Sequence, residues 1–302
     1  MSRYAPQRPV RRATVTATAV LGACAALVTA GPGTALAEGT GATGSFGARY
    51  VALGDSYASG FGIIPVEHEA CGRGKANYPH VLRTVYKSKS YTNAACGGAT
   101  TRSIWNAHKG EPPQIKALKP DTTLVTVSVG GNDIGFEKIV TECAFLGVQQ
   151  PTGAPCQSKF KGGLEDDFKK LEPRIASVVI DIKRKSPKAT VVLVGYPALV
   201  PASGATCDRS EVPFAAGDFS FLHGTLVRLN TMIEEQARKA GAVYADTYKP
   251  SVGYHMCASD DKRMIQPLLA DGRVAPAAAH PNLRGIIRMG GTISQVLAKH
   301  AG

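Results

Sequence analysis

The sequence lacks the motifs on which several classes of enzyme depend. It has no H-E-x-x-H, no C-x-x-C pair and no acidic calcium-binding loop, so catalytic or structural metals have no support. It also lacks the G-x-S-x-G pentapeptide that the nucleophile turn of α/β-hydrolases requires. No basic run is interleaved with aromatic residues, which argues against nucleic-acid binding. We therefore expect a protein without metal, organic cofactor or nucleic-acid partner.

Long apolar runs are almost absent, and the one candidate lies in the first 37 residues. Residues 1–12 carry four arginines and no acid, and an apolar run follows over 13–29. Glycine and proline interrupt it at 31–33, and an A-x-A site ends at Ala37. A membrane span needs ~20 apolar residues, so this pattern predicts a cleaved signal peptide over 1–37. We expect a secreted, extracellular protein without a stable membrane anchor; Arg11-Arg12 leaves Sec and Tat export both open.

Positive charge exceeds negative charge along the chain. The formal net charge is +12, and loss of the four arginines before residue 38 leaves +8. Such a charge favours solubility and attraction to anionic lipid surfaces.

Cysteine is scarce but even in number once the signal peptide is removed. Six cysteines then remain of the seven in the chain, and an even count in an exported protein predicts three disulfides. Six cysteines allow 15 connectivities, of which we favour the pairing of sequence neighbours. The expected bonds are Cys71–Cys96, Cys143–Cys156 and Cys207–Cys257.

Residues 38–47 are rich in glycine and are expected to form a flexible lead-in. Residues 48–302 are expected to form one domain, because short apolar runs alternate with helical patterns throughout this range. The expected strands cover 49–53, 91–95, 123–129, 190–195 and 242–246, and the expected helices cover 78–87, 164–185, 221–240 and 283–299, with Pro173 marking a kink or break. This alternation predicts an α/β fold with a central parallel sheet covered on both faces. Ligands then bind beyond the C-terminal ends of the strands.

Two Gly-rich turns follow the first two predicted strands. Ser56 lies in the turn 54–60, directly after the strand 49–53, where a nucleophile would be displayed. Gly97 and Gly98 follow the strand 91–95 and would let backbone N–H groups approach a ligand. Each feature alone is also typical of an ordinary tight turn.

Two further motifs complete the set. Asn132 follows Gly130-Gly131 after the strand 123–129, so its side-chain amide could donate to an oxyanion or merely cap the turn. His280 precedes Pro281 at the start of the last predicted helix, which exposes it at a helix boundary. One of seven histidines, it is by itself more typical of a surface or packing residue than of a base.

Taken together, the four blocks resemble the SGNH/GDSL hydrolase family in content and in order. They are G-D-S-Y, the glycine pair, G-G-N-D and H-P-N. The resemblance extends from Tyr50 to about Met289 and is strongest to secreted actinomycete (Streptomyces-type) esterases, lipases and phospholipases. It implies a flavodoxin-like, three-layer α/β/α sandwich with a central parallel sheet.

The resemblance also implies roles. Ser56 matches the family's nucleophile and, through its N–H, the first oxyanion donor. Gly98 matches the second donor, with Gly97 as the alternative, and Asn132 matches the third. His280 matches the base. Asp55 and Asp133 are expected to fix their loops.

The chain departs from the family pattern at one position. Many members carry an aspartate three residues before the histidine, where this chain has Ala277. We therefore expect a Ser–His dyad in which the carbonyl of Ala277 or Ala278 accepts from the second ring nitrogen, with a distant acid such as Asp271 as the alternative. Without a carboxylate partner, the imidazolium should be less stabilised.

The expected activity is hydrolysis of small-molecule or lipid carboxylic esters through an acyl-enzyme, in the manner of a lipase or phospholipase, at a lipid interface, by a monomer. A carbohydrate O-acetyl esterase is the alternative, and a non-catalytic secreted binding protein on the same fold is the alternative of another class. Trp105 and loops over 61–77, 101–113 and 134–160 are expected to shape the cleft.

Overall fold

The computed structural model describes residues 46–301. The predicted signal peptide at 1–37 and nearly all of the lead-in at 38–47 lie outside the described residues. In the described part of the chain, no helix is long and apolar enough to cross a membrane.

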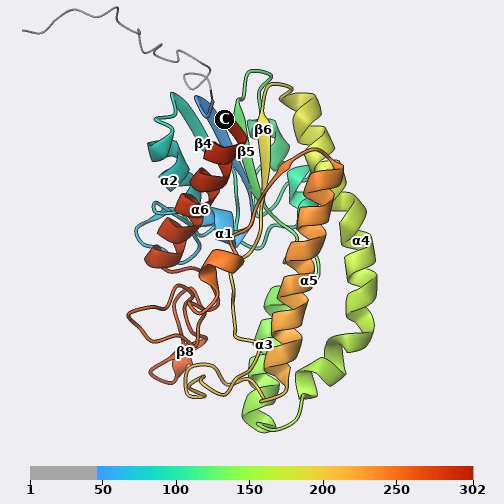
Figure 1. Ribbon diagram of the computed structural model, residues 1–302, viewed down its shortest axis with the longest axis vertical. Coiled ribbons are helices and arrows are strands. Elements are labelled where there is room, and N and C mark those ends of the chain that lie inside the picture. Colours follow the sequence, from blue (N-terminus) through green and yellow to red (C-terminus); the bar gives the residue numbers. More distant parts are fainter. Residues whose placement is uncertain (1–45, 302) are drawn as a thin grey trace, which may run out of the picture. The chain divides into compact units, whose positions relative to one another are not determined.

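A five-stranded parallel sheet forms the centre of the fold, in the order β4-β1-β5-β6-β7 (Figure 1). The strands are β1 (Arg49–Gly54), β4 (Ser90–Asn93), β5 (Leu124–Ser128), β6 (Thr190–Val194) and β7 (Val243–Ala245). Every residue of β5 is buried, as expected of a central strand covered on both faces. All five predicted strands are therefore present, with ends shifted by one or two residues.

Helices cover both faces of this sheet, which gives the predicted three-layer α/β/α architecture (Figure 1). On one face α2 (Tyr78–Val85) packs against α6 (Leu283–Ala301) over a core that includes Tyr50 and Ile293. On the other face α4 (Pro155–Lys185) packs against α5 (Asp218–Lys239) and α3 (Phe136–Gln149) over a larger core. Successive side chains of a strand enter opposite cores: in β1, Val51 and Leu53 belong to the larger core, and Tyr50 and Ala52 to the smaller one.

Local chemistry sets the helix ends. The Asn77 side chain caps α2 by accepting from the His80 N–H at 2.8 Å, as N-terminal caps do. Gly241 follows α5 with φ of 68°, the left-handed conformation that ends many helices. Pro173 lies within α4, which continues through it, so the alternative of a helix break there is wrong.

The prediction of a loop over 134–160 is also wrong, because most of this segment forms α3 and the start of α4. Gly135 precedes α3 in a left-handed conformation and offers no side-chain cap, so the usual start signal is missing. The shorter elements are α1 (Ser56–Ser59), β2 (Val66–His68), β3 (Arg73–Gly74), η1 (Thr101–Ile104), η2 (Gln114–Ala117), η3 (Lys249–Ser251), β8 (Leu269–Ala270) and β9 (Arg273–Val274).

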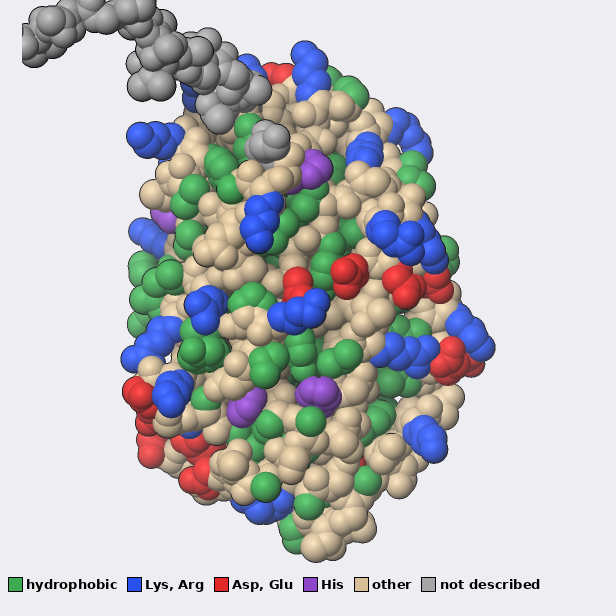
Figure 2. Space-filling view, in the orientation of Figure 1, with side chains coloured by type: hydrophobic (Ala, Val, Ile, Leu, Met, Phe, Trp, Pro, Cys, Tyr) green, Lys and Arg blue, Asp and Glu red, His purple; other side chains and the backbone are tan. Residues whose placement is uncertain are grey.

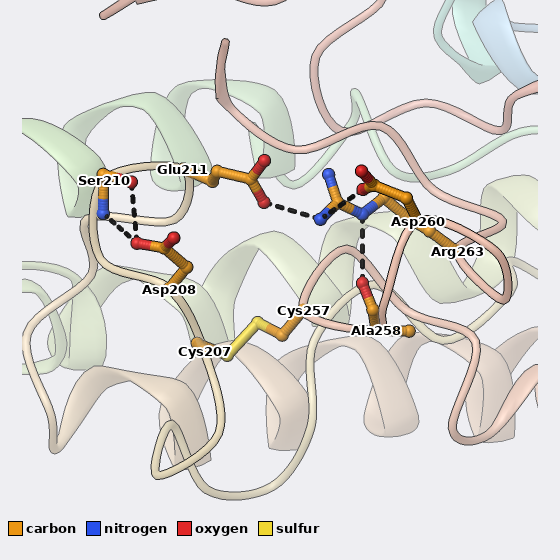
Figure 3. A network of polar contacts seen from close by, with 8 residues as sticks. All are labelled: Cys207, Asp208, Ser210, Glu211, Cys257, Ala258, Asp260 and Arg263. Carbon is orange, nitrogen blue, oxygen red and sulfur yellow. Dashed lines mark hydrogen bonds and ion pairs between the residues drawn. A yellow bond between two sulfur atoms is a disulfide. The ribbon is translucent and has the colours of Figure 1, made fainter. Parts of the chain in front are cut away.

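Three disulfides join the cysteine pairs that were expected from sequence order, Cys71–Cys96, Cys143–Cys156 and Cys207–Cys257. Figure 3 shows the last of these beside a polar network that joins two long loops. In it Arg263 pairs with Glu211 at 2.6 Å and with Asp260 at 3.1 Å. The loop that carries Arg263 leads into β8 and then into the segment with His280, whereas the loop that carries Glu211 leads into α5.

Lysine and arginine side chains are spread over the face seen in Figure 2 and do not gather into one patch there. Negative side chains lie among them on that face.

Candidate active site

Ser56 is displayed at the C-terminal end of β1 by a tightly held turn. The Gln114 side chain accepts from the Gly54 N–H at 2.7 Å and donates to the Gly54 carbonyl at 2.9 Å. Gly54 has φ of 131° and lies against the backbone of Ser128, where a Cβ would clash. Asp55 then caps α1 by accepting from the Tyr57 N–H at 3.0 Å. Ser56 is thereby the first residue of α1.

His280 meets Ser56 although 224 residues separate them in the chain. Its Nε2 lies 2.8 Å from Ser56 Oγ, and its Nδ1 lies 2.8 Å from the carbonyl oxygen of Ala278. If Nδ1 carries the proton and donates it to this carbonyl, Nε2 is left as an acceptor for the serine hydroxyl. Burial lowers the pKa of His280, while the Ala278 carbonyl and the charge of Glu137 act in the opposite direction.

The backbone before His280 explains how Ala278 reaches the ring. Ala277 and Ala279 both have positive φ, 55° and 62°, a costly conformation for residues with a Cβ. The Ala277 carbonyl accepts from the His280 N–H at 2.9 Å, so of the two predicted carbonyls only that of Ala278 contacts the imidazole. Asp271 lies in the exposed turn between β8 and β9, and its side chain does not line the cleft.

The two candidate glycines differ in their hydrogen bonds. The Gly97 N–H donates to the Cys71 carbonyl at 2.9 Å and is therefore occupied. Gly98 has φ of 78°, and among the described residues its N–H and that of Ser56 have no hydrogen-bond acceptor. Gly98 does not itself line the cleft. It adjoins Ala99, whose carbonyl accepts from Asn132 Nδ2 at 2.9 Å.

Tyr196, which the sequence reasoning missed, joins two of the predicted blocks. Its hydroxyl donates to Asp55 Oδ2 at 2.5 Å and accepts from the Gly131 N–H at 3.0 Å. The Asn230 side chain of α5 holds its backbone by bonds of 2.8 and 2.9 Å. Tyr196 follows β6, so the rule that ligands bind at strand ends could have identified it.

Tyr57 extends this arrangement to the histidine segment. Its ring packs edge-on against Tyr196, with centroids 5.0 Å apart, and lies 5.2 Å from the His280 ring. Its hydroxyl donates to the Ala279 carbonyl at 2.7 Å. The serine turn, the asparagine turn and the histidine segment are thus joined through two tyrosines.

Both aspartates of the motifs are buried and bonded to the protein. Burial raises the pKa of Asp55 to about 7, against the opposing effect of the Tyr196 hydrogen bond. Burial also raises the pKa of Asp133, which accepts from the Thr101 hydroxyl at 2.5 Å and the Thr101 N–H at 2.8 Å. These contacts fasten the loops, as expected for both residues.

Ser56, Asn132 and His280 line a cleft of about 270 Å³ whose walls are mainly apolar. The walls come from the segment after α1, from α3 and α5, from the segment after β6 and from the segment 268–279. Their apolar members are Phe61, Phe136, Val140, Leu199, Leu226, Leu229, Leu268, Val274, Ala275, Ala277, Ala278 and Ala279. Of the expected loops, 61–77 contributes only Phe61 and 101–113 contributes nothing. Trp105 instead donates to Asp181 on α4 at 2.8 Å.

The described residues contain no cluster of three His, Cys, Asp or Glu side chains able to hold a metal ion. The arrangement offers instead a hydroxyl next to an imidazole, with free N–H groups nearby. These groups, at the strand ends of a parallel sheet, are the ones that a serine-type hydrolase uses.

Comparison with known proteins agrees with that class. Residues 52–285 match the GDSL-like Lipase/Acylhydrolase family. The chain is 35% identical to Lipase 2 of Streptomyces coelicolor over 246 residues, covering 80% of this chain and 82% of the relative. It is 32% identical to an esterase of Streptomyces scabiei over 330 residues, covering 94% and 93% of the two chains.

Among solved structures, the chain is similar to phospholipase A1 from Streptomyces albidoflavus NA297, with a TM-score of 0.68 and 26% identity. That match covers 84% of this chain and 99% of the other. The protein belongs to the GDSL-like Lipase/Acylhydrolase family and is a carboxylic ester hydrolase.

Proposed function

We propose that this protein is a secreted esterase that hydrolyses lipid esters with a Ser56–His280 dyad. The observation that carries the proposal is the chain of two 2.8 Å contacts from Ser56 Oγ through the imidazole to the Ala278 carbonyl. A backbone carbonyl in this position fixes the tautomer and orientation of the ring, which is the role that a carboxylate has in a Ser-His-Asp triad.

The proposed reaction has two steps. His280 Nε2 takes the hydroxyl proton as Ser56 Oγ attacks the ester carbonyl, and the imidazolium then protonates the leaving alcohol. Water repeats the sequence on the acyl-enzyme and releases the acid. The Ser56 and Gly98 N–H groups and the Asn132 amide are the proposed oxyanion donors, and the bond from Asn132 to Ala99 supports a fixed orientation of that amide.

The preference for lipid esters is supported by the cleft walls. Leu199, Leu229 and Leu268 are buried and line the cleft, so an acyl chain entering it would leave water for an apolar surface. Of the polar residues that line the cleft besides the proposed catalytic ones, Asp55, Tyr57 and Tyr196 are bonded within the protein, which leaves Glu137 and Thr141 for a carbohydrate substrate.

Secretion is supported by two independent features. The N-terminal pattern is that of a signal peptide, and the three disulfides suit an oxidising compartment.

A substrate panel tests the proposed function. The purified protein is assayed on p-nitrophenyl esters of increasing acyl length, on phosphatidylcholine and triacylglycerol, and on acetylxylan, with Ser56→Ala as the inactive control. We expect kcat/KM to rise from acetyl to longer acyl esters and lipids to be hydrolysed. Acetylxylan as the preferred substrate would contradict the lipid assignment, and full activity of Ser56→Ala would contradict the dyad.

A further inference from the structure

Glu137 is a carboxylate in the cleft that the proposed mechanism does not use. It lies in the first turn of α3 and lines the same cleft as Ser56 and His280. Its side chain is exposed, and within the described residues it has no ion-pair or hydrogen-bond partner. An unpaired charge at this place is available to a ligand.

The charges that line the cleft are all of one sign. Glu137 and Asp55 are its acidic residues, and the described residues that line it include no lysine or arginine. The neighbouring Lys138 faces a different depression, formed by α3 and α4. A protein with a net charge of +12, or +8 without residues 1–37, therefore has an acidic reaction cleft.

Aromatic rings surround the same space. Phe61 and Tyr57 lie with ring centroids 5.0 and 5.2 Å from the His280 ring, and Phe136 lines the cleft next to Glu137. Glu137 also lies close enough to His280 to oppose the lowering of its pKa by burial. A carboxylate in a cleft lined by aromatic rings offers the two kinds of group that bind a quaternary ammonium ion.

From this we infer that Glu137 is a specificity-determining residue that binds a cationic ammonium group on the alcohol side of the substrate, as in esters of choline. The inference rests on the proposed function, since it names the class of ester that the dyad prefers. An attraction between an exposed carboxylate and a partly shielded cation should favour such an ester about fivefold in kcat/KM over an uncharged one.

A matched pair of soluble esters tests the inference without a lipid surface. Butyrylcholine carries the ammonium group, and 3,3-dimethylbutyl butyrate replaces its nitrogen with carbon. We expect wild type to prefer the choline ester about fivefold at low salt, and Glu137→Gln to bring the ratio of the two kcat/KM values to about one. Glu137→Asp should keep part of the preference.

Glu142→Gln is the control, because Glu142 lies on the same helix, pairs with Lys159 and does not line the cleft. This variant makes the same change of charge and should keep the wild-type ratio. Raising the salt to about 1 M shortens the Debye length to about 3 Å and should lower the ratio in wild type but not in Glu137→Gln.

Each outcome bears on the inference separately from the proposed function. A wild-type ratio near one, a ratio unchanged by Glu137→Gln, or an equal loss on both esters would overturn the role of Glu137. If wild type hydrolyses neither of the two esters nor p-nitrophenyl butyrate, the proposed function is overturned instead.

Discussion

At the scale of single residues, the site depends on an imidazole that has no carboxylate partner. His280 is held by the Ala278 carbonyl at 2.8 Å, an uncharged acceptor that stabilises an imidazolium less than an aspartate would. Its pKa is lowered chiefly by burial. Because the base must be unprotonated to accept the serine proton, the histidine should stay functional to a lower pH than an exposed one.

The pH profile of kcat/KM on an uncharged soluble ester measures this effect. We expect the acid limb that reports His280 to have its midpoint below the ordinary histidine pKa of about 6.5. Asp55, with a pKa of about 7, is the second group that titrates near the site, so the same profile is recorded for Asp55→Asn. A limb above about 6.5 that persists in Asp55→Asn would contradict the account of His280.

The residue types at the site were predictable from the sequence, but their hydrogen bonds were not. Gly-flanked Ser56 and Asn132 follow apolar strands, so their position at one edge of the sheet follows from the strand pattern. The choice of Ala278 over Ala277 depends on positive φ at two alanines, which nothing in their residue type indicates. Tyr196 and Glu137 were missed because one tyrosine and one glutamate carry no motif.

At the scale of elements, the strands and long helices were predicted well because their apolar periodicity is strong. Helix α3 was missed even though Phe136, Ile139, Val140 and Cys143 have helical spacing. The absence of a cap and the nearby glycines outweighed that signal. The secondary structure predicted for 134–160 was therefore wrong, but its expected place beside the cleft is confirmed, since α3 forms one wall.

The Cys207–Cys257 disulfide anchors the loop that leads to His280 to the loop that precedes α5. Together with Arg263 and Glu211 it fastens the segment before β8 (Figure 3). Gln266 N–H then donates to the His280 carbonyl at 2.9 Å. Loss of the disulfide should therefore affect stability and the histidine segment together.

Replacing both cysteines by serine tests this. The bond closes a loop with a sequence separation of 50, so its removal should cost about 4 kcal/mol of unfolding free energy and lower kcat. The double variant Cys143→Ser/Cys156→Ser opens a loop with a separation of 13 and should cost less, about 3 kcal/mol. Urea unfolding and steady-state kinetics provide the measurements; equal stability of wild type and the Cys207→Ser/Cys257→Ser variant would refute the anchoring role.

At the scale of the whole molecule, the topology brings the two ends of the domain together. The parallel sheet places the C-terminal ends of β1, β5 and β6 on the same side of the sheet. The segment before α6 brings His280 back to that side. The strand pattern predicted where Ser56 and Asn132 lie, and the family resemblance implied that His280 joins them. The acidic cleft within a basic protein became evident only from the fold. The net charge of the whole chain therefore does not indicate the charge of the cleft.

The central claim is that Ser56 is the nucleophile activated by His280 across the 2.8 Å contact. Its most direct test is labelling of the purified protein with a fluorophosphonate, followed by peptide mass spectrometry. The account predicts one adduct, on Ser56, with loss of esterase activity in proportion to labelling, and slow labelling of His280→Ala. An adduct on another residue, or full activity after Ser56 is labelled, would contradict it.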